Sequence, residues 1–516
     1  MEEIGNLFHG FATVLAFRDM NIFGYTMSIP FNVILMVIGI VLGIIIGILP
    51  GLGGANGVAI LLPLTFSMQP TSAIILLSCI YWGALFGGAI TSILFNIPGE
   101  PWSVATTFDG YPMAQQGRAG EALTAAFTSS FVGALFAVIL ITLIAPLVAG
   151  FALQFGAAEK FAVYFLAFAS FVGLSKEPPF KTLAAMMIGF ALATIGNDQI
   201  TGQLRLTYGT TELIAGFDFL IAVIGLFGIG EILLTMEEGL SFKGREAKMN
   251  LSIVLQTWKK LAKYWWLSLR SCIIGCWMGI TPAGATPASF MSYGIAKRIS
   301  KNGKNFGNGE IEGVVAPETA AHAAGTSALL PMLALGVPGS PTAAVLLGGL
   351  LIWNLQPGPM LFVENKEFVW GLIASMYLGN VVGLIIVLTC VPFLAAILRI
   401  PFGIIAPIIL MFCSVGAYTV NNSFFDVIMM FVFGILGYVL KKCNYPLAPL
   451  VLAMVLGDRA EEAFRQALIS SNGSLGTFFS NGLVSSIMTL GLIALFWSVI
   501  SAGIARIRGT NAATAA

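Results

Sequence analysis

Apolar stretches of membrane-spanning length alternate with short polar segments along this chain of 516 residues. A helix needs about 20 apolar residues to cross the hydrocarbon layer of a bilayer. The pattern therefore predicts an all-α polytopic membrane protein with roughly ten to twelve spans, together with shorter apolar helices that cannot cross alone. The expected spans lie near 31–49, 73–95, 123–150, 158–175, 180–196, 213–236, 264–281, 314–336, 368–398, 401–418, 423–441 and 480–505.

The composition agrees with this pattern and excludes several classes of protein. Hydrophobic residues make up 57% of the chain and charged residues 9%, whereas soluble domains carry about 25% charged residues. The formal net charge of +1 leaves no basic face for nucleic acid. The expected partners are therefore the lipid bilayer and small solutes.

Polar segments separate the apolar stretches into larger parts. Residues 237–263 form a long basic connection, which we expect in the cytoplasm by the positive-inside rule. A second basic cluster comprises Lys297, Arg298, Lys301 and Lys304, and the sequence does not assign its side. Residues 1–30 are expected to form an interfacial segment that is not a cleaved signal peptide, and residues 506–516 a C-terminal tail.

Two matched pairs of Pro-Gly motifs indicate an internal repeat. The first part, 31–236, contains GILPGLGGANG from Gly47 and FNIPGEP ending at Pro101. The second part, 264–505, contains GITPAGATPAS from Gly279 and LGVPGSP ending at Pro341. Because the order and approximate spacing agree, we expect two related transmembrane repeats, inverted relative to each other.

The Pro-Gly motifs predict re-entrant hairpin tips and broken helices. Proline removes a helical hydrogen bond, and the freed backbone groups are tolerated at membrane depth only inside protein or beside a polar cavity. Paired breaks in two halves are typical of a transporter binding site near the bilayer centre. The tips would be Pro50–Gly54 and Pro282–Thr286, and the helix breaks Ile97–Pro101 and Val337–Pro341. The alternative is that the breaks are kinks that help helices to pack.

The residues around these breaks are the candidate ligands, because helix amides suit carboxylate oxygens and carbonyl or hydroxyl oxygens suit Na⁺. The predicted substrate-binding residues are Gly53, Gly54, Asn56, Asn96, Gly99, Ser103, Thr286, Ser289, Glu318, His322, Gly339, Ser340 and Thr342. The predicted coupling-ion residues are Pro50, Gly51, Thr91, Ser92, Ala283, Gly284, Thr326 and Ser327.

Four ionisable residues lie near the breaks. Glu318 and His322 share one helix face, and His322 could bind a carboxylate or relay a proton; a structural role for both is equally open. Asp109, before Gly110, is expected in an interfacial turn. The role of Glu100 is left open, and Ser340 occupies the matching position in the second half.

No enzyme, metal site or cofactor is expected. The chain lacks a nucleophile elbow, a phosphate-binding P-loop and a dinucleotide fingerprint. Its six cysteines are scattered through apolar runs and lack a full ligand set for a metal. Energy for transport would come from an ion gradient or partner proteins, with Na⁺ or H⁺ as the coupling ion.

Several long motifs resemble one known family. They include ILPGLGGANGVAILLPLTF, PETAAHAAGTSALLPMLALGVPGSPTAAVLLGGLLIWNLQPGP and YPLAPLVLAMVLGDRAEEAFRQAL. With further matches over nearly the whole chain, they make it similar to the large membrane subunit of the tripartite tricarboxylate transporters.

The resemblance implies a secondary importer of small organic carboxylates such as citrate in a bacterial inner membrane. It implies two partners, a small four-span membrane subunit and a periplasmic solute-binding protein that delivers substrate. A homodimer is left open, and an elevator-like core is expected by analogy. The rival interpretations are a stand-alone organic-anion carrier or channel, which lacks the binding protein, and a membrane-embedded enzyme.

One position departs from the family pattern. Family members commonly carry two asparagines after the Pro-Glu pair, where this chain has Ala321 and His322. Histidine introduces a titratable group in place of a neutral amide. We therefore hypothesise altered carboxylate recognition with His322 facing the site.

Overall fold

The computed structural model describes residues 2–22, 25–49, 52–173, 178–198, 200–238, 250–281, 284–397 and 402–497. Several predictions lie outside these residues: those for Pro50, Gly51, Pro282 and Ala283, for 239–249 of the basic connection, and for the tail 506–516.

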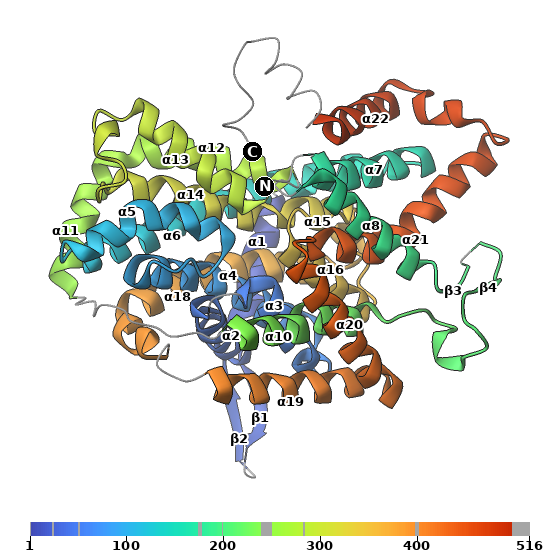
Figure 1. Cartoon of the computed structure of the whole chain (residues 1–516), viewed down its shortest axis with the longest axis horizontal. Helices are drawn as coiled ribbons and strands as arrows, with labels where there is room; N and C mark the ends of the chain where they lie inside the picture. The colour runs from blue at the N-terminus through green and yellow to red at the C-terminus, as the bar shows by residue number, and fades with distance from the viewer. Residues whose placement is uncertain are drawn as a thin grey trace. The chain divides into compact units, whose positions relative to one another are not determined.

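The described residues are mostly helical, and their strands form two short hairpins, so the predicted all-α polytopic class is confirmed (Figure 1). Contacts divide it into two compact units, each built from separate stretches of sequence: Met1–Gly150 with Leu220–Val439, and Phe151–Phe219 with Leu440–Ala516. The two sequence repeats at 31–236 and 264–505 stay a prediction.

The first unit carries most of the helices. Their bounds are α1 Glu2–Leu15, α2 Phe31–Ile48, α3 Gly53–Leu61, α4 Pro70–Phe95, α5 Val104–Gln115, α6 Ala119–Ala152, α9 Phe219–Val223, α10 Gly230–Glu238, α11 Leu251–Leu261, α12 Trp265–Ile280, α13 Ala285–Ile299, α14 Glu312–Ser327, α15 Leu329–Leu335, α16 Pro341–Ile352, α17 Leu361–Glu364, α18 Lys366–Ile397, α19 Phe402–Asn421 and α20 Phe424–Lys442. The strands β1 Arg18–Ile22 and β2 Tyr25–Ile29 pair antiparallel.

The second unit is smaller. It contains α7 Ala157–Gly173, α8 Pro179–Ala193, α21 Leu447–Ser470, α22 Gly482–Leu495 and the short strands β3 Gly196–Asn197 and β4 Leu204–Arg205. Asp198 beside β3 accepts hydrogen bonds from Arg205 and from Arg465 of α21, and Arg205 also pairs with Glu461. This ion-pair network attaches the β3–β4 hairpin to α21.

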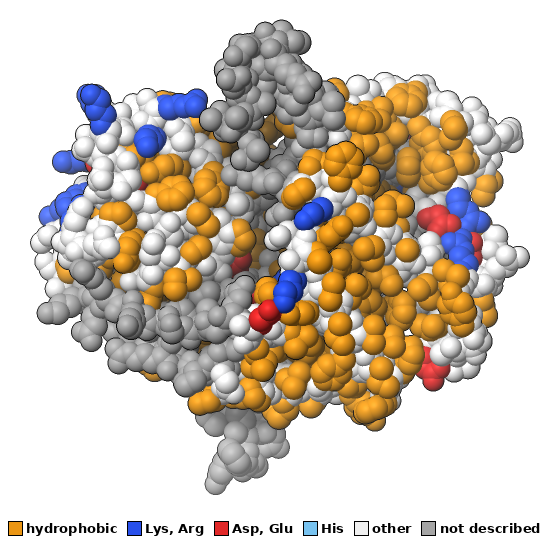
Figure 2. Space-filling model, in the orientation of Figure 1, with side chains coloured by type: hydrophobic (Ala, Val, Ile, Leu, Met, Phe, Trp, Pro, Cys, Tyr) orange, Lys and Arg blue, Asp and Glu red, His pale blue; other side chains and the backbone are white. Residues whose placement is uncertain are grey.

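Six helices of the described chain are long and apolar enough to cross a membrane. They are Phe31–Ile48, Pro70–Phe95, Ala119–Ala152, Phe219–Glu237, Lys366–Cys390 and Phe424–Lys442. Shorter apolar helices include Pro179–Ala193, Pro341–Ile352 and Gly482–Leu495. Hydrophobic side chains cover large areas of the surface in Figure 2, as expected where the solvent is lipid.

Glycines allow the central helices of the first unit to approach closely. A Cβ at Gly43 of α2 would lie 2.1 Å from the carbonyl oxygen of Ile80 in α4, so a side chain cannot fit there. A Cβ added at Gly279 of α12 would likewise lie 2.2 Å from the carbonyl oxygen of Ala324 in α14. Such close backbone contact is typical of helices packed within a membrane. As a result, the window of α4 that could span the membrane is wholly buried.

Candidate functional site

The first predicted helix break is present where α4 ends. Asn96 adopts a left-handed conformation with φ of 59°, which stops the helix after Phe95. A Cβ at Gly99 would lie 2.4 Å from the carbonyl oxygen of Gly47, so this position requires glycine. The Ser103 hydroxyl donates to the Glu100 carbonyl oxygen at 2.7 Å. The backbone N–H of Glu100 donates back to the same hydroxyl, which fixes the turn into α5.

The carboxylate of Glu100 reaches the first hairpin tip. Its Oε1 accepts a hydrogen bond from the backbone N–H of Gly54, in the first turn of α3. Gly53 has φ of +56°, and a Cβ there would lie 2.9 Å from Oε2. The predicted ligands Gly53 and Gly54 therefore already contact a carboxylate, and it belongs to the protein itself. Asn56 lies one turn further along α3 and is buried.

The second predicted break repeats several of these contacts. Gly336 ends α15 with φ of 73°, and a Cβ at Gly339 would lie 2.5 Å from the carbonyl oxygen of Gly279. Ser340 caps α16 by accepting a hydrogen bond from the Ala343 N–H at 3.1 Å. Thr342 is buried in the first turn of α16. Both breaks thus pack the glycine of their Pro-Gly pair on a backbone carbonyl.

Tyr81 joins the two breaks in the first unit. Its ring lies against Gly54, since a Cβ on that glycine would be 3.2 Å from Cδ2. Its hydroxyl donates to the carbonyl oxygen of Gly325 at 2.9 Å and also interacts with the Ser340 side chain. The phenol additionally experiences the charge of Glu100. Residues of both predicted halves therefore meet around one side chain of α4.

The second tip contacts the turn after the first break. The Ser289 hydroxyl of α13 donates to the Trp102 carbonyl oxygen at 2.7 Å. The Trp102 side chain packs against the alanine cluster of α13 and α14, which includes Ala285 and Ala320. Gly284 precedes α13 with φ of +81°. The predicted tip of one half thus lies on the break of the other.

Glu318 and His322 form a buried polar cluster in α14. Glu318 accepts hydrogen bonds from Thr106 of α5 at 2.5 Å and from Ser130 of α6 at 3.0 Å. His322 Nδ1 lies 3.1 Å from the Glu318 carbonyl oxygen and 3.6 Å from its Oε2. The imidazole packs on the ring of Phe86, with 5.2 Å between centroids. Neither Glu318 nor His322 is more than 2% exposed.

Three buried polar atoms near this cluster have no hydrogen-bond partner among the described residues: Nε2 of His322 and the hydroxyls of Thr319 and Thr326. A buried polar group without a partner is costly. Such groups are rare in native proteins and call for an explanation, such as a ligand or an ion. They are therefore consistent with a polar site inside α14.

The remaining predicted residues have varied positions. The hydroxyls of Thr91 and Ser92 both donate to the Gly88 carbonyl oxygen within α4, at 3.1 and 2.8 Å. The Ser327 hydroxyl lies 3.4 Å from the Cys276 carbonyl oxygen of α12. Asn96 is exposed, and Thr286 is half-buried in the first turn of α13. No described contact joins Asn96 to the residues around Tyr81.

The expectation of an interfacial turn at Asp109 is wrong. This residue lies inside α5 and is fully buried. Its Oδ1 accepts hydrogen bonds from the N–H groups of Gly307, Gly309 and Glu310, and its Oδ2 from the Tyr293 hydroxyl at 2.9 Å. The Asp-Gly pair resembles a turn signal, but these four donors hold the carboxylate inside the protein.

The sequence reading also missed Tyr81 and Trp102. Both lie next to predicted residues, yet tyrosine and tryptophan in apolar helices are usually packing residues. Trp102 directly follows the first break, which is a sequence signal, whereas Tyr81 lies in the middle of α4 and reaches the tip only through the fold.

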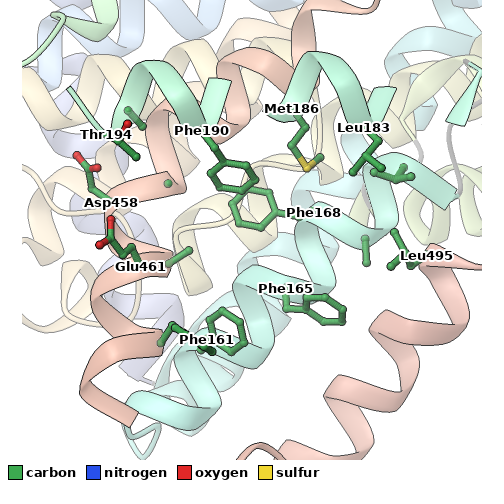
Figure 3. A pocket seen from close by; sticks show the side chains of 16 residues that line it. Phe161, Phe165, Phe168, Leu183, Met186, Phe190, Thr194, Asp458, Glu461 and Leu495 are labelled. Atoms are coloured by element: carbon green, nitrogen blue, oxygen red, sulfur yellow. The ribbon is translucent and has the colours of Figure 1, made fainter. Parts of the chain in front are cut away.

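The second unit contains a separate apolar cavity of about 420 Å³. In Figure 3 four phenylalanine rings of α7 and α8 line it, while Asp458 and Glu461 of α21 stand at one end: the rings are Phe161, Phe165, Phe168 and Phe190. None of the predicted site residues lies in this cavity.

Comparisons with known proteins give a consistent assignment. A model of the tripartite tricarboxylate transporter TctA family matches residues 33–452. An uncharacterized 52.8 kDa protein in the TAR-I ttuC' 3'region of Agrobacterium vitis is 37% identical over 507 residues, which cover 97% of this chain and 98% of that protein. An uncharacterized protein in the TAR-II ttuC' 3'region of the same organism is 39% identical over 227 residues, 44% of this chain and 94% of that protein. No solved structure matches.

Proposed function

Because this chain is a membrane transporter that belongs to the tripartite tricarboxylate transporter TctA family, we propose that it is the large permease subunit of an ion-gradient-driven importer. Its cargo would be small di- or tricarboxylates, handed over by a periplasmic binding protein. A small four-span subunit would accompany it in the bacterial inner membrane.

The convergence of both helix breaks on Tyr81 is the observation that carries this proposal. Gly54 and Glu100 approach Tyr81 from the first half, and Gly325 and Ser340 from the second. Broken helices that meet inside an apolar helix bundle are typical of transporter binding sites. A passive pore would need a continuous polar path, whereas the groups around Tyr81 are buried.

The chemistry of the tips supports an anionic cargo. The Gly54 N–H binds a carboxylate oxygen in this structure, so the backbone there can hold a carboxylate. Helix amino termini favour anions through their unpaired N–H groups and dipole. The buried hydroxyls and the imidazole of His322 would complete the site, with Na⁺ or H⁺ as the coupling ion.

Uptake into proteoliposomes tests the proposal. The chain would be reconstituted with a four-span subunit and a binding protein of the same family from its source organism, and uptake of radiolabelled citrate, succinate and malate would be followed with Na⁺ or pH gradients. We expect saturable, gradient-dependent uptake and counterflow of at least one carboxylate. Flux that does not saturate would indicate a channel, and saturable uptake without the binding protein a stand-alone carrier. Absence of uptake for the whole panel would contradict the proposed cargo class.

A further inference from the structure

Glu100 ties the first helix break to the first hairpin tip. Its carboxylate accepts the Gly54 N–H and lies directly beside Gly53. The matching residue of the second half, Ser340, is uncharged; its side chain accepts the Ala343 N–H of its own helix and interacts with Tyr81. The two halves therefore differ in one respect: the first tip is held by a negative charge, and the matching position cannot hold the second tip in that way.

Four of the helices around this contact carry no fixed charge. The sequences of α2, α3, α4 and α16 contain no Asp, Glu, Lys, Arg or His. The phenol of Tyr81 in α4 interacts electrostatically with Glu100.

Other helices packed against the break do carry ionisable side chains. The acidic ones are bonded elsewhere: Asp109 of α5 to 307–310, Glu318 of α14 to Thr106 and Ser130, and Glu312 of α14 to Ser300. Tyr293 of α13 donates to Asp109. Lys297 and Arg298 lie in the last turn of α13, and His322 lies on α14 beside Phe86.

Separating this carboxylate from the tip has an electrostatic cost. A buried anion that loses a hydrogen-bond donor in a region of low dielectric becomes unstable unless its charge is neutralised. A proton on the carboxylate, or a Na⁺ ion at its oxygens, would neutralise it. Either ion is the kind of cation that a secondary transporter couples to its cargo.

We propose that Glu100 is a coupling residue: while ionised it holds Gly53 and Gly54, at the start of α3, against the helix break, and it releases them when the coupling cation neutralises its charge. Release would free the Gly54 N–H for a substrate carboxylate. The substrate anion then replaces the charge that Glu100 has lost, so the net charge at the tip is preserved. Cation binding would thereby favour anion binding. This inference rests on the proposed function, since it assumes an anionic cargo.

The accessibility of the first tip to a thiol reagent tests this role of Glu100 without any substrate. Ala55 follows Gly54 and is half-buried, so A55C would report movement of the tip to a membrane-permeant maleimide. The native cysteines that are not buried, Cys390 and Cys443, would be replaced by serine. Labelling rates would be measured in detergent-solubilised full-length protein with and without Na⁺, at pH 5.5 and pH 8.

We expect Na⁺ or low pH to accelerate labelling of A55C relative to E100Q/A55C. The double variant should be labelled rapidly under all conditions, because glutamine keeps the size and acceptor of Glu100 but no charge. The expected difference is about tenfold, the effect of losing one hydrogen bond to a charged group. Dividing each rate by that of E100Q/A55C removes the intrinsic pH dependence of the thiol.

Two further variants keep the test decisive. E100D retains the charge and should keep the cation dependence, which also serves if E100Q fails to fold. E367Q neutralises an exposed carboxylate on α18 and should leave labelling unchanged. The proposal is overturned if E100Q shows the cation dependence of the parent, or if E100D loses it in a folded protein.

Transport assays distinguish a failure of this proposal from a failure of the proposed transport function. If the wild-type chain moves carboxylates, E100Q should retain exchange while losing gradient-driven accumulation, and accumulation at the wild-type level would overturn the coupling role. If labelling depends on the cation through Glu100 but no carboxylate is transported, the proposed cargo class is wrong. The cation-dependent contact between Glu100 and Gly54 is then still supported.

Discussion

At the scale of single residues, the breaks depend on glycines that touch backbone. A methyl group at Gly99 or Gly339 would lie 2.4 or 2.5 Å from a carbonyl oxygen of the facing helix. Neither helix can move away without disturbing its own packing. We therefore expect G99A and G339A to lower the free energy of unfolding by about 1–3 kcal/mol, the usual effect of overpacking.

Thermal unfolding in detergent would measure this effect, with G294A as the matched control. Gly294 lies in α13, and nothing is within 4 Å of the added Cβ, so alanine should be neutral or stabilising by up to about 1 kcal/mol. Equal melting temperatures for G99A and G294A would show that the carbonyl contact does not constrain the break.

His322 gives a second prediction at this scale. It is buried beside Glu318, and its Nε2 has no partner among the described residues. If that nitrogen binds the cargo or carries a proton during transport, H322N should change the pH dependence of uptake between pH 5.5 and 8. The measurement is initial uptake of the carboxylate that wild type transports, across this range. Identical profiles for the variant and wild type would assign His322 a packing role on Phe86.

At the scale of elements, Asp109 anchors the polar segment between α13 and α14. Three backbone N–H groups of 307–310 donate to one of its oxygens. Hydrogen bonds to a charged group contribute about 1.5–3 kcal/mol. D109N should therefore raise amide hydrogen exchange at Gly307, Gly309 and Glu310 by roughly ten- to a hundredfold.

The control for this prediction is Y293F, which removes only the Tyr293 hydroxyl bond to the other oxygen. It should increase exchange at these three amides much less than D109N does. Unchanged exchange in D109N would mean that other contacts hold the segment in place.

The stability that the β3–β4 hairpin gives to the second unit should depend on pH. Hydrogen bonds from the Thr201 N–H and Arg465 hold the pKa of Asp198 well below its ordinary value of 3.8, and the bond from Arg205 lowers the pKa of Glu461 from 4.5. A depressed pKa stabilises the fold at pH values above the ordinary pKa, and this stabilisation is lost as the pH falls below it.

D198N should thus melt at a lower temperature than wild type at pH 7, and the difference should shrink below about pH 4. Melting curves of both proteins from pH 7 to pH 3 would measure it. A difference that stays constant down to pH 3 would show that the carboxylate charge is not what attaches the hairpin.

These elements show which predictions sequence can support. Hydrophobic length predicted the helices, and the Pro-Gly motifs predicted both breaks because proline and glycine act locally. The partners of Glu100 and Asp109 could not be predicted, since they depend on contacts with Gly54 and with 307–310, which are distant in sequence. Tyr81 was missed for the same reason.

At the scale of the whole molecule, the family predicted from sequence motifs is confirmed by the match over 33–452 and by a relative that spans the chain. The motifs were sufficient because they are long and cover both halves. Substrate, coupling ion and partner subunits are absent from any such motif, because they depend on the shape of the site and on other chains.

The orientation of the first unit in the membrane can also be predicted from its contacts. Lys260 pairs with Glu121 at 2.7 Å, and Arg118 donates to the Gly309 carbonyl oxygen at 3.1 Å. Helix α11 of the basic connection and the segment around Lys304 therefore lie at the same end, where lysine and arginine side chains gather in Figure 2. The positive-inside rule predicts that this end lies in the cytoplasm, so we expect the second basic cluster on the cytoplasmic side as well.

Cysteine labelling would test this orientation. Ser252 and Lys304 are exposed, so S252C and K304C, each in a background without Cys390 and Cys443, should react with a membrane-impermeant maleimide in inside-out vesicles. In right-side-out vesicles both should react only after the membrane is permeabilised. Because the contacts of Arg118 and Lys260 join the two segments, labelling of the two cysteines from opposite sides would contradict the packing itself. Labelling of both from outside would instead reverse the orientation and leave the packing intact.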